Sequence, residues 1–178
     1  MRGPSALAAF LVFAAVPAAA QDGAVPLSLE EAVTLRLSDA SNDATIIERG
    51  EAEWTPYDVA VARRFVRGDF DHAVGPVAAP TPQDGSLPEP RRIEPGAVRI
   101  RFLDLAGQHA LLVIENGYGS ALRYRATIGL ENRVATTDVC VVVPNGRGTE
   151  HWPYRIDRIV LTDFRLEPWS EDSRVTCQ

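Results

Sequence analysis

Residues 98–130 read VRIRFLDLAGQHALLVIENGYGSALRYRATIGL, and this stretch decides the fold class. Apolar side chains alternate with two arginines over residues 98–102, and residues 121–130 repeat this alternation. Such a period of two is typical of a β-strand with one buried face. The middle part, residues 109–115, is apolar at both parities, as in a strand that is covered on both sides.

The β pattern continues toward the C-terminus. Residues 139–143 (VCVVV) and 159–166 (IVLTDFRL) are further expected strands. Between strands, Asn116-Gly117 predicts a tight hairpin, because a two-residue turn needs positive φ. At least five strands, spaced by roughly 8–12 residues, predict an antiparallel β-sandwich, with an immunoglobulin-like sandwich or a small barrel as alternatives. We place this sandwich at residues 98–178.

A helix-containing segment is expected at residues 21–74. Residues 28–38 fit both helix and strand: Ser28 and Glu31 form a capping-box pattern, whereas residues 33–37 alternate as in a strand. Both alternatives stay open at this point.

A short helix is clearer at residues 56–67. Thr55 is a good N-cap, Pro56 suits the first helical position, and Gly68 suits the end. The helical period predicts that one face buries Tyr57, Val61, Ala62 and Phe65.

Six prolines separate this helix from the expected sandwich. They fall within residues 75–97. Proline fixes φ and removes a backbone donor, so regular structure is disfavoured there. We expect a proline-rich linker or a long surface loop.

The first twenty residues predict a secretory signal. Arg2 precedes an apolar run over residues 6–16, Pro17 interrupts it, and residues 18–20 are the small alanines that a signal peptidase requires. The run is shorter than the roughly 20 apolar residues that span a bilayer. We therefore expect cleavage before Gln21, no transmembrane segment after cleavage, and a periplasmic or secreted protein.

Cys140 and Cys177 are the two cysteines of the chain. In an oxidising compartment an even pair predicts a disulfide, worth about 3–4 kcal/mol on the chain-entropy estimate. This bond would tie the C-terminal tail to the strand around Cys140.

Composition excludes several chemistries. The formal net charge is −6, which disfavours nucleic-acid binding, and all 18 basic residues are arginine. Without lysine there is no Schiff base and no phosphate-loop lysine. The three histidines stand at no ligand spacing, so we expect no metal and no cofactor.

Residues 148–158 (GTEHWPYRIDR) collect catalytic residue types. His151 with Glu150 or Asp157 could form an acid–base pair, which makes a small envelope hydrolase the alternative function. The same residues could equally form an ion-pair cluster with neighbouring arginines. We expect no catalytic site.

Arginine rows offer a second kind of site. If the strands at 98–104, 109–115 and 121–129 form a meander, four arginines flank Leu111 and Val113 on one face: Arg99, Arg101, Arg123 and Arg125. Such a face is either covered, with the helix at 56–67 packing across it, or binds an anionic ligand or acidic partner.

Aromatic residues near turns give a third candidate surface. Tyr118, Trp152 and Tyr154, together with His151, would form either a recognition surface or, for Trp152, a plug of the core. From these patterns we expect a non-catalytic binding or interaction module of the cell envelope. Its partner would be a protein, a glycan or an anionic envelope ligand.

Overall fold

The structure is a computed structural model. It describes residues 23–38, 43–65, 86–105, 107–130 and 133–178. The expected signal at residues 1–20 and residues 75–85 of the proline-rich segment lie outside these ranges, as do the last two residues of the expected helix.

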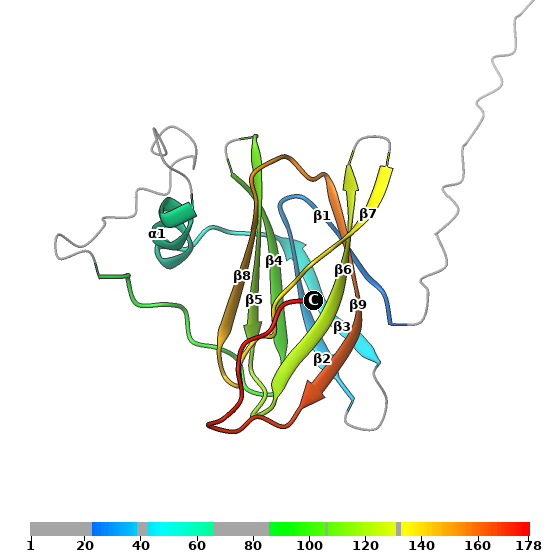
Figure 1. The fold of residues 1–178 in the computed structure, drawn as a ribbon. Helices are drawn as coiled ribbons and strands as arrows, with labels where there is room; N and C mark the ends of the chain where they lie inside the picture. The colour runs from blue at the N-terminus through cyan, green and yellow to red at the C-terminus, as the bar shows by residue number, and fades with distance from the viewer. Residues whose placement is uncertain (1–22, 39–42, 66–85, 106, 131–132) are drawn as a thin grey trace, which may run out of the picture.

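Two antiparallel sheets pack face to face, so the predicted β-sandwich is confirmed (Figure 1). The four-stranded sheet has, in spatial order, β1 (Val25–Ser28), β9 (Arg158–Glu167), β6 (Ala121–Leu130) and β7 (Arg133–Thr137). The five-stranded sheet has β3 (Ala44–Glu51), β2 (Glu31–Leu37), β4 (Val98–Leu105), β5 (His109–Asn116) and β8 (Arg147–Trp152).

The main core lies between the two sheets. Ile100 and Phe102 of β4 point into it, together with Leu112 of β5, and Tyr124 and Phe164 meet them from the opposite sheet. Because side chains alternate along a strand, the arginines of β4 then lie on the outer face of the five-stranded sheet. Residues 98–102 therefore form a strand with one face in the core, as their alternation predicted.

Strand β6 leaves the sheet that contains β5, so the expected meander is wrong. The Asn116 side-chain amide directs this crossing: its Nδ2 donates to the carbonyl oxygens of Ser120 (2.9 Å), Val142 (3.3 Å) and Val143 (3.1 Å). Asn116-Gly117 is thus not a hairpin turn, and neither residue has positive φ. A buried amide that satisfies three carbonyls fixes the chain more firmly than a turn preference does.

The N-terminal strands join both sheets. β1 pairs with β9 and β2 pairs with β4, through a turn in which Glu30 has φ 66°. The Ser28 amide donates to the Glu31 carboxylate (2.8 Å), so half of the capping-box interaction is made in a turn between strands. The open alternative at residues 28–38 is resolved as strand, and the sandwich extends beyond residues 98–178.

Helix α1 (Pro56–Phe65) is confirmed, with its predicted start. Thr55 Oγ1 accepts from the Asp58 amide (3.2 Å), and Asp58 accepts from the Thr55 amide (2.9 Å). The buried face was predicted only in part. Val59, Ala60 and Ala62 are buried, whereas Phe65 is exposed. The reason is that the helix docks on the sheet through its first two turns, and Phe65 ends the helix.

This helix covers the outer face of the five-stranded sheet (Figure 1). Val59 and Ala62 pack against Leu111 and Val113, so of the two alternatives for these residues the covered one holds. A second, smaller apolar cluster therefore forms outside the main core.

The disulfide is present between Cys140 and Cys177. Around it, Val139 and Gln178 exchange two backbone hydrogen bonds (2.9 and 3.0 Å), which holds the C-terminal tail in place. The expected strand at 139–143 is wrong, since this segment makes only isolated bridges while it crosses from one sheet to the other.

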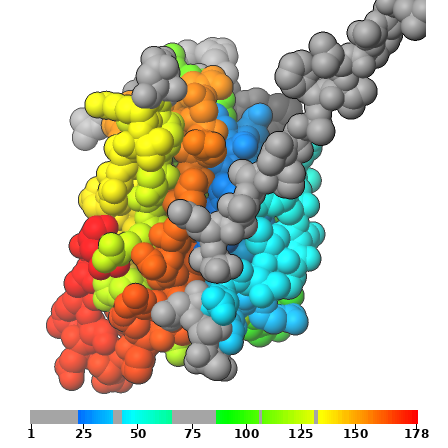
Figure 2. All heavy atoms as spheres, turned by 90° about the vertical axis from the view of Figure 1, so that its right-hand side faces the viewer, coloured from blue at the N-terminus to red at the C-terminus, as the bar shows by residue number. Residues whose placement is uncertain are grey.

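The opposite side of the molecule is the outer face of the four-stranded sheet (Figure 2). In this view β9 lies between β7 and β1, and β3 lies beyond β1. No helix among the described residues is long and apolar enough to cross a membrane.

Candidate functional site

Strand pairing lines up five polar side chains across the outer face of the five-stranded sheet. Glu48, Thr34, Arg99, Glu115 and Arg147 are successive cross-strand partners on β3, β2, β4, β5 and β8. We call these residues the charged row. Opposite partners share a face of the sheet, so the row is a property of register and not of sequence proximity.

Ion pairs tie the charged row to helix α1. Arg101, two residues beyond Arg99 on β4, pairs with the Asp58 carboxylate, and the two side chains are only 3% and 1% exposed. Glu115 Oε1 lies 3.6 Å from Arg101 Nη2 and 3.3 Å from Arg147 Nε, and it is 4% exposed. Buried charges of this kind persist only when paired, so the network fixes the helix on the sheet.

Arg99 stands apart from this network. Its Nε is buried without a hydrogen-bond partner, and so is Nη2 of Arg147. Among the described residues no carboxylate pairs with Arg99, although Glu115 is its direct cross-strand partner. A buried donor left without an acceptor costs about 1–3 kcal/mol, so these atoms point to a missing acceptor.

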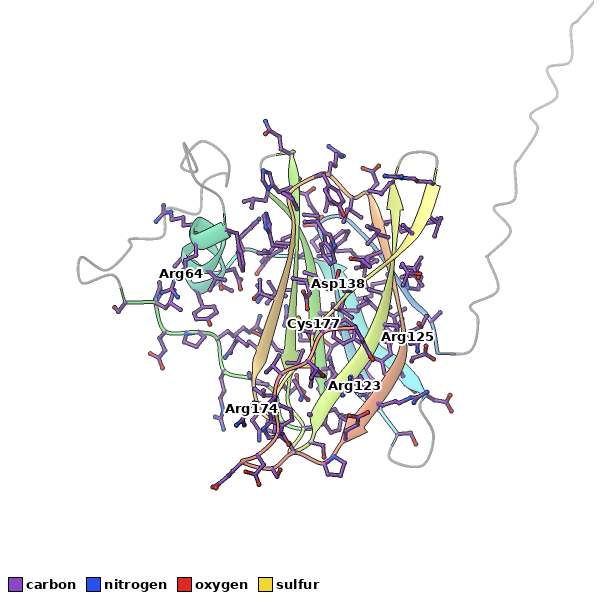
Figure 3. All side chains as sticks on the ribbon, viewed as in Figure 1. Arg64, Arg123, Arg125, Asp138, Arg174 and Cys177 are labelled. Carbon is purple, nitrogen blue, oxygen red and sulfur yellow. A yellow bond between two sulfur atoms is a disulfide. The ribbon has the colours of Figure 1, made fainter. Side chains whose placement is uncertain are left out.

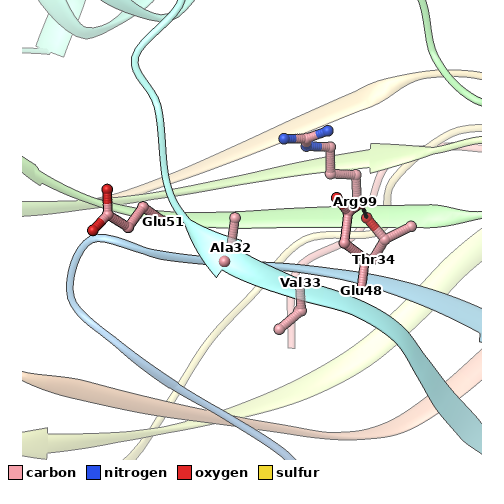
Figure 4. Close-up of a pocket in the computed structure, with 7 residues that line it drawn as sticks. Ala32, Val33, Thr34, Glu48, Glu51 and Arg99 are labelled. Atoms are coloured by element: carbon pink, nitrogen blue, oxygen red, sulfur yellow. Dashed lines mark hydrogen bonds between the residues drawn. The ribbon is translucent and has the colours of Figure 1, made fainter.

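Two pockets meet at Arg99. The pocket toward β3 encloses about 230 Å³, part of it open to solvent, and is lined by Ala32, Val33, Thr34, Glu48, Gly50, Glu51 and Arg99. The Arg99 guanidinium extends away from the hydrogen-bonded Thr34–Glu48 pair (Figure 4). The pocket toward the loop has about 330 Å³ of empty space, again partly open to solvent, and is lined by Arg91, Arg92, Ile93, Glu94, Ala97, Arg99 and Glu115.

The four predicted arginines do not form one surface. Arg123 and Arg125 lie on β6, in the other sheet and across the sandwich from α1 (Figure 3). Arg123 Nε is 3.0 Å from a Glu167 oxygen, and Arg125 Nε is 3.6 Å from an Asp163 oxygen. The expectation of a single arginine surface depended on the meander, and both expectations are wrong. Of the four, Arg99 keeps the features of a ligand site.

His151 faces outward from β8, where its Nε2 lies 2.9 Å from Nδ1 of His109. The Phe65 ring of α1 stacks on it, with ring centroids 5.1 Å apart. Burial and the charge of His109 lower the pKa of His151. The side-chain partner of His151 is therefore another imidazole and not a carboxylate.

The two carboxylates of the alternative catalytic group lie elsewhere. Glu150 points to the opposite face of β8, where its Oε1 accepts from the Cys140 amide (2.6 Å) and the Tyr124 hydroxyl (3.4 Å). Burial raises the pKa of Glu150, and burial with the nearby Glu150 charge raises that of Tyr124. Asp157 pairs with Arg155 at 2.9 Å on the surface. The structure does not assemble a His151–carboxylate pair.

The aromatic residues divide between core and surface. Trp152 is 6% exposed and its Nε1 donates to Thr137 Oγ1 (2.9 Å), so it plugs the core. Tyr118 packs against the main core, and its hydroxyl accepts from the Leu37 amide (2.8 Å). Tyr154 is 43% exposed. The expected aromatic recognition surface is therefore reduced to Tyr154.

Sequence reasoning missed Arg91, Arg92, Glu115 and Arg147 as site residues. No local motif marks them, because strand pairing and the path of the loop bring them to Arg99. Among the described residues no three histidine, cysteine or acidic side chains are placed to hold a metal ion. No family model, curated protein or solved structure matches the chain.

Proposed function

We propose that this protein is a non-catalytic binding module of the cell envelope that takes an anionic ligand at Arg99. The observation that carries the proposal is Arg99 itself, whose Nε is buried without an acceptor and whose side chain lines two pockets. An oxyanion group of the ligand supplies that acceptor. Charge-assisted hydrogen bonds between guanidinium and oxyanion are strong and can be bidentate.

Charges around the loop pocket support an anion. Arg91 and Arg92 are exposed at this pocket, and Arg99 reaches it from β4. The acidic residues of the same pocket are Glu94 and Glu115, and Glu115 is already shared by the buried Arg101 and the half-buried Arg147. The pocket therefore contains the three guanidinium groups of Arg91, Arg92 and Arg99 and one carboxylate, that of Glu94, which is not shared with Arg101 or Arg147. Its net charge is positive.

Helix α1 limits where the ligand sits. It buries the apolar outer face beside Leu111 and Val113 and neutralises Arg101 through Asp58. Arg99 lies one alternation away from Arg101 on β4, beyond this cover. The ligand is accordingly placed at the end of the sheet near the loop and β3.

Location in the periplasm or outside the cell is part of the proposal. The disulfide and the apolar N-terminal sequence support it. Intact mass of protein from the native envelope fraction is the test: we expect a chain that begins at Gln21 and carries no free thiol. A full-length chain with reduced cysteines would contradict this location.

The ligand site is tested by substituting Arg99 with glutamine. Retention on immobilised lipopolysaccharide and on heparin is measured over a salt gradient, since screening weakens such contacts. Losing one guanidinium–oxyanion contact is expected to weaken binding about 10- to 100-fold, from roughly 1.5–3 kcal/mol per charged hydrogen bond.

Arg125→Gln is the matched control. Arg125 is an exposed arginine of the other sheet, so this variant has the same net charge as Arg99→Gln but keeps the pocket. Equal retention of the two variants would reduce the interaction to net charge and overturn the site. Failure of the native protein to bind either matrix would overturn the anionic ligand itself.

A further inference from the structure

The last turn of α1 is joined to the sheet by a pair of imidazoles. His109 Nδ1 and His151 Nε2 are 2.9 Å apart, and their ring planes differ by 15° with centroids 5.2 Å apart. Phe65 stacks on the outer side of His151 at 5.1 Å. The three rings join β5, β8 and α1.

This geometry places one proton between the two histidines. A nitrogen-to-nitrogen distance of 2.9 Å between nearly parallel rings is that of an N–H···N hydrogen bond, in which one ring donates and the other accepts. A first added proton can go to an outer nitrogen without breaking the bond. When both rings are protonated, two N–H donors face each other and the rings must separate.

We propose that the His109–His151 pair is a pH-sensitive latch that holds the last turn of α1 on the sheet at neutral pH and releases it on acidification. Release follows from the stack: rotation of the His151 ring away from His109 removes the surface on which Phe65 lies. The first turns of the helix remain anchored by Asp58 and Arg101.

Apolar residues flank the latch on the sheet and favour its neutral form. Leu105 is the cross-strand partner of His109 and Leu111 that of His151, and both leucines belong to the apolar cluster that Ala62 joins from α1. The charged residues of the same helical turn are cationic, namely Arg63 and Arg64. None of these residues offers a carboxylate that would stabilise a doubly protonated pair.

The pKa of His151 agrees in sign with this mechanism. It is lowered below 6.5 in the folded protein, first by burial and then by the charge of His109. A lowered pKa means that the unfolded or opened form binds the proton more tightly. The stabilisation is therefore fully present above pH 6.5 and is lost as the pH falls through the folded-state pKa.

Opening of the latch is confined to the last turn of α1. Asp58, which pairs with Arg101, and Tyr57, whose ring lies 5.8 Å from the Arg147 guanidinium, belong to the first turn and stay in place. The latch therefore acts independently of the proposed ligand site.

Hydrogen exchange of the α1 amides, read without ligand, tests the latch. Protection factors of residues 60–65 are measured between pH 7.5 and 5, corrected for the intrinsic rates. In the native protein protection is expected to fall by up to about tenfold per pH unit below pH 6.5, the slope of one linked proton.

His151→Phe removes the titrating ring but keeps an aromatic surface for Phe65. In this variant we expect protection that does not change with pH. Nitrogen chemical shifts of the two imidazoles in the native protein provide a second readout that needs no variant. Parallel pH profiles in the native protein and His151→Phe overturn the latch, as does a doubly protonated pair that keeps full protection of α1.

Anion binding is measured separately at both pH values. Exchange in α1 that responds to pH while retention by lipopolysaccharide does not is the expected outcome, because the first turn of the helix stays anchored by Asp58 and Arg101. If native protein and Arg99→Gln bind equally at both pH values, the proposed ligand site fails while the latch stays untouched.

Discussion

Gly117 shows how one position controls the loop pocket. Its amide donates to the Ala97 carbonyl and its carbonyl accepts from Gly96, both at 2.8 Å. A Cβ at this position would lie 1.8 Å from the Glu94 oxygen and 2.8 Å from the Ala97 oxygen. Glycine is thus required here for a close backbone approach and not for a turn.

Gly117→Ala is therefore expected to destabilise the protein by about 1–3 kcal/mol, because residues 94–97 must move away. Urea denaturation measures the loss. Gly119→Ala is the matched control, since a Cβ at Gly119 meets nothing within 4 Å. A loss of the same size in both variants would show that the Gly117 contact with Glu94 does not matter.

At the scale of an element, α1 depends on one buried ion pair more than on its helix propensity. Asp58 caps the helix through Thr55 and neutralises Arg101. Asp58→Ala leaves buried Arg101 with the Glu53 carbonyl and the longer 3.6 Å contact to Glu115, and loss of its close carboxylate partner costs about 3 kcal/mol. We expect a matching drop in unfolding free energy, together with loss of hydrogen-exchange protection in α1.

Replacing both partners separates the charge from the cap. Asp58→Ala with Arg101→Met removes the buried Arg101 charge, so this double variant should recover most of the lost stability. Thr55→Ala, which removes one cap hydroxyl, should cost only about 1 kcal/mol. If the double variant is as unstable as Asp58→Ala, the cap and not the buried charge explains the effect.

At the scale of the whole molecule, the disulfide fastens the segment that crosses between the sheets. Cys140 lies in that crossing and Cys177 lies 37 residues further on, near the C-terminus. Replacing both by alanine should lower the unfolding free energy by about 4 kcal/mol. Denaturation of the native protein with and without reductant measures the same effect, and unchanged midpoints would contradict it.

The sequence predicted individual elements well where a local signal was strong. Thr55 and Pro56 predicted the start of α1, and the alternation at 98–102 predicted which β4 residues enter the core. It could not separate helix from strand at 28–38, because Ser28–Glu31 supports either and pairing with β4 decides.

The candidate site was predicted only in part. Arg99 was identified, but it was grouped with Arg123 and Arg125, which lie on the other sheet. That error came from reading Asn116-Gly117 as a hairpin. A turn preference is worth little against three hydrogen bonds from a buried amide, and these bonds send β6 to the other sheet.

The sequence by itself determined the β-sandwich class, the helix and the pairing of the two cysteines, because these depend on local periodicity, caps and a cysteine count of two. Only the tertiary structure decided which strands are neighbours, and with them the charged row, the free Nε of Arg99 and the contact between His109 and His151. Strand order depends on contacts between residues far apart in the chain, and local sequence patterns do not specify these contacts.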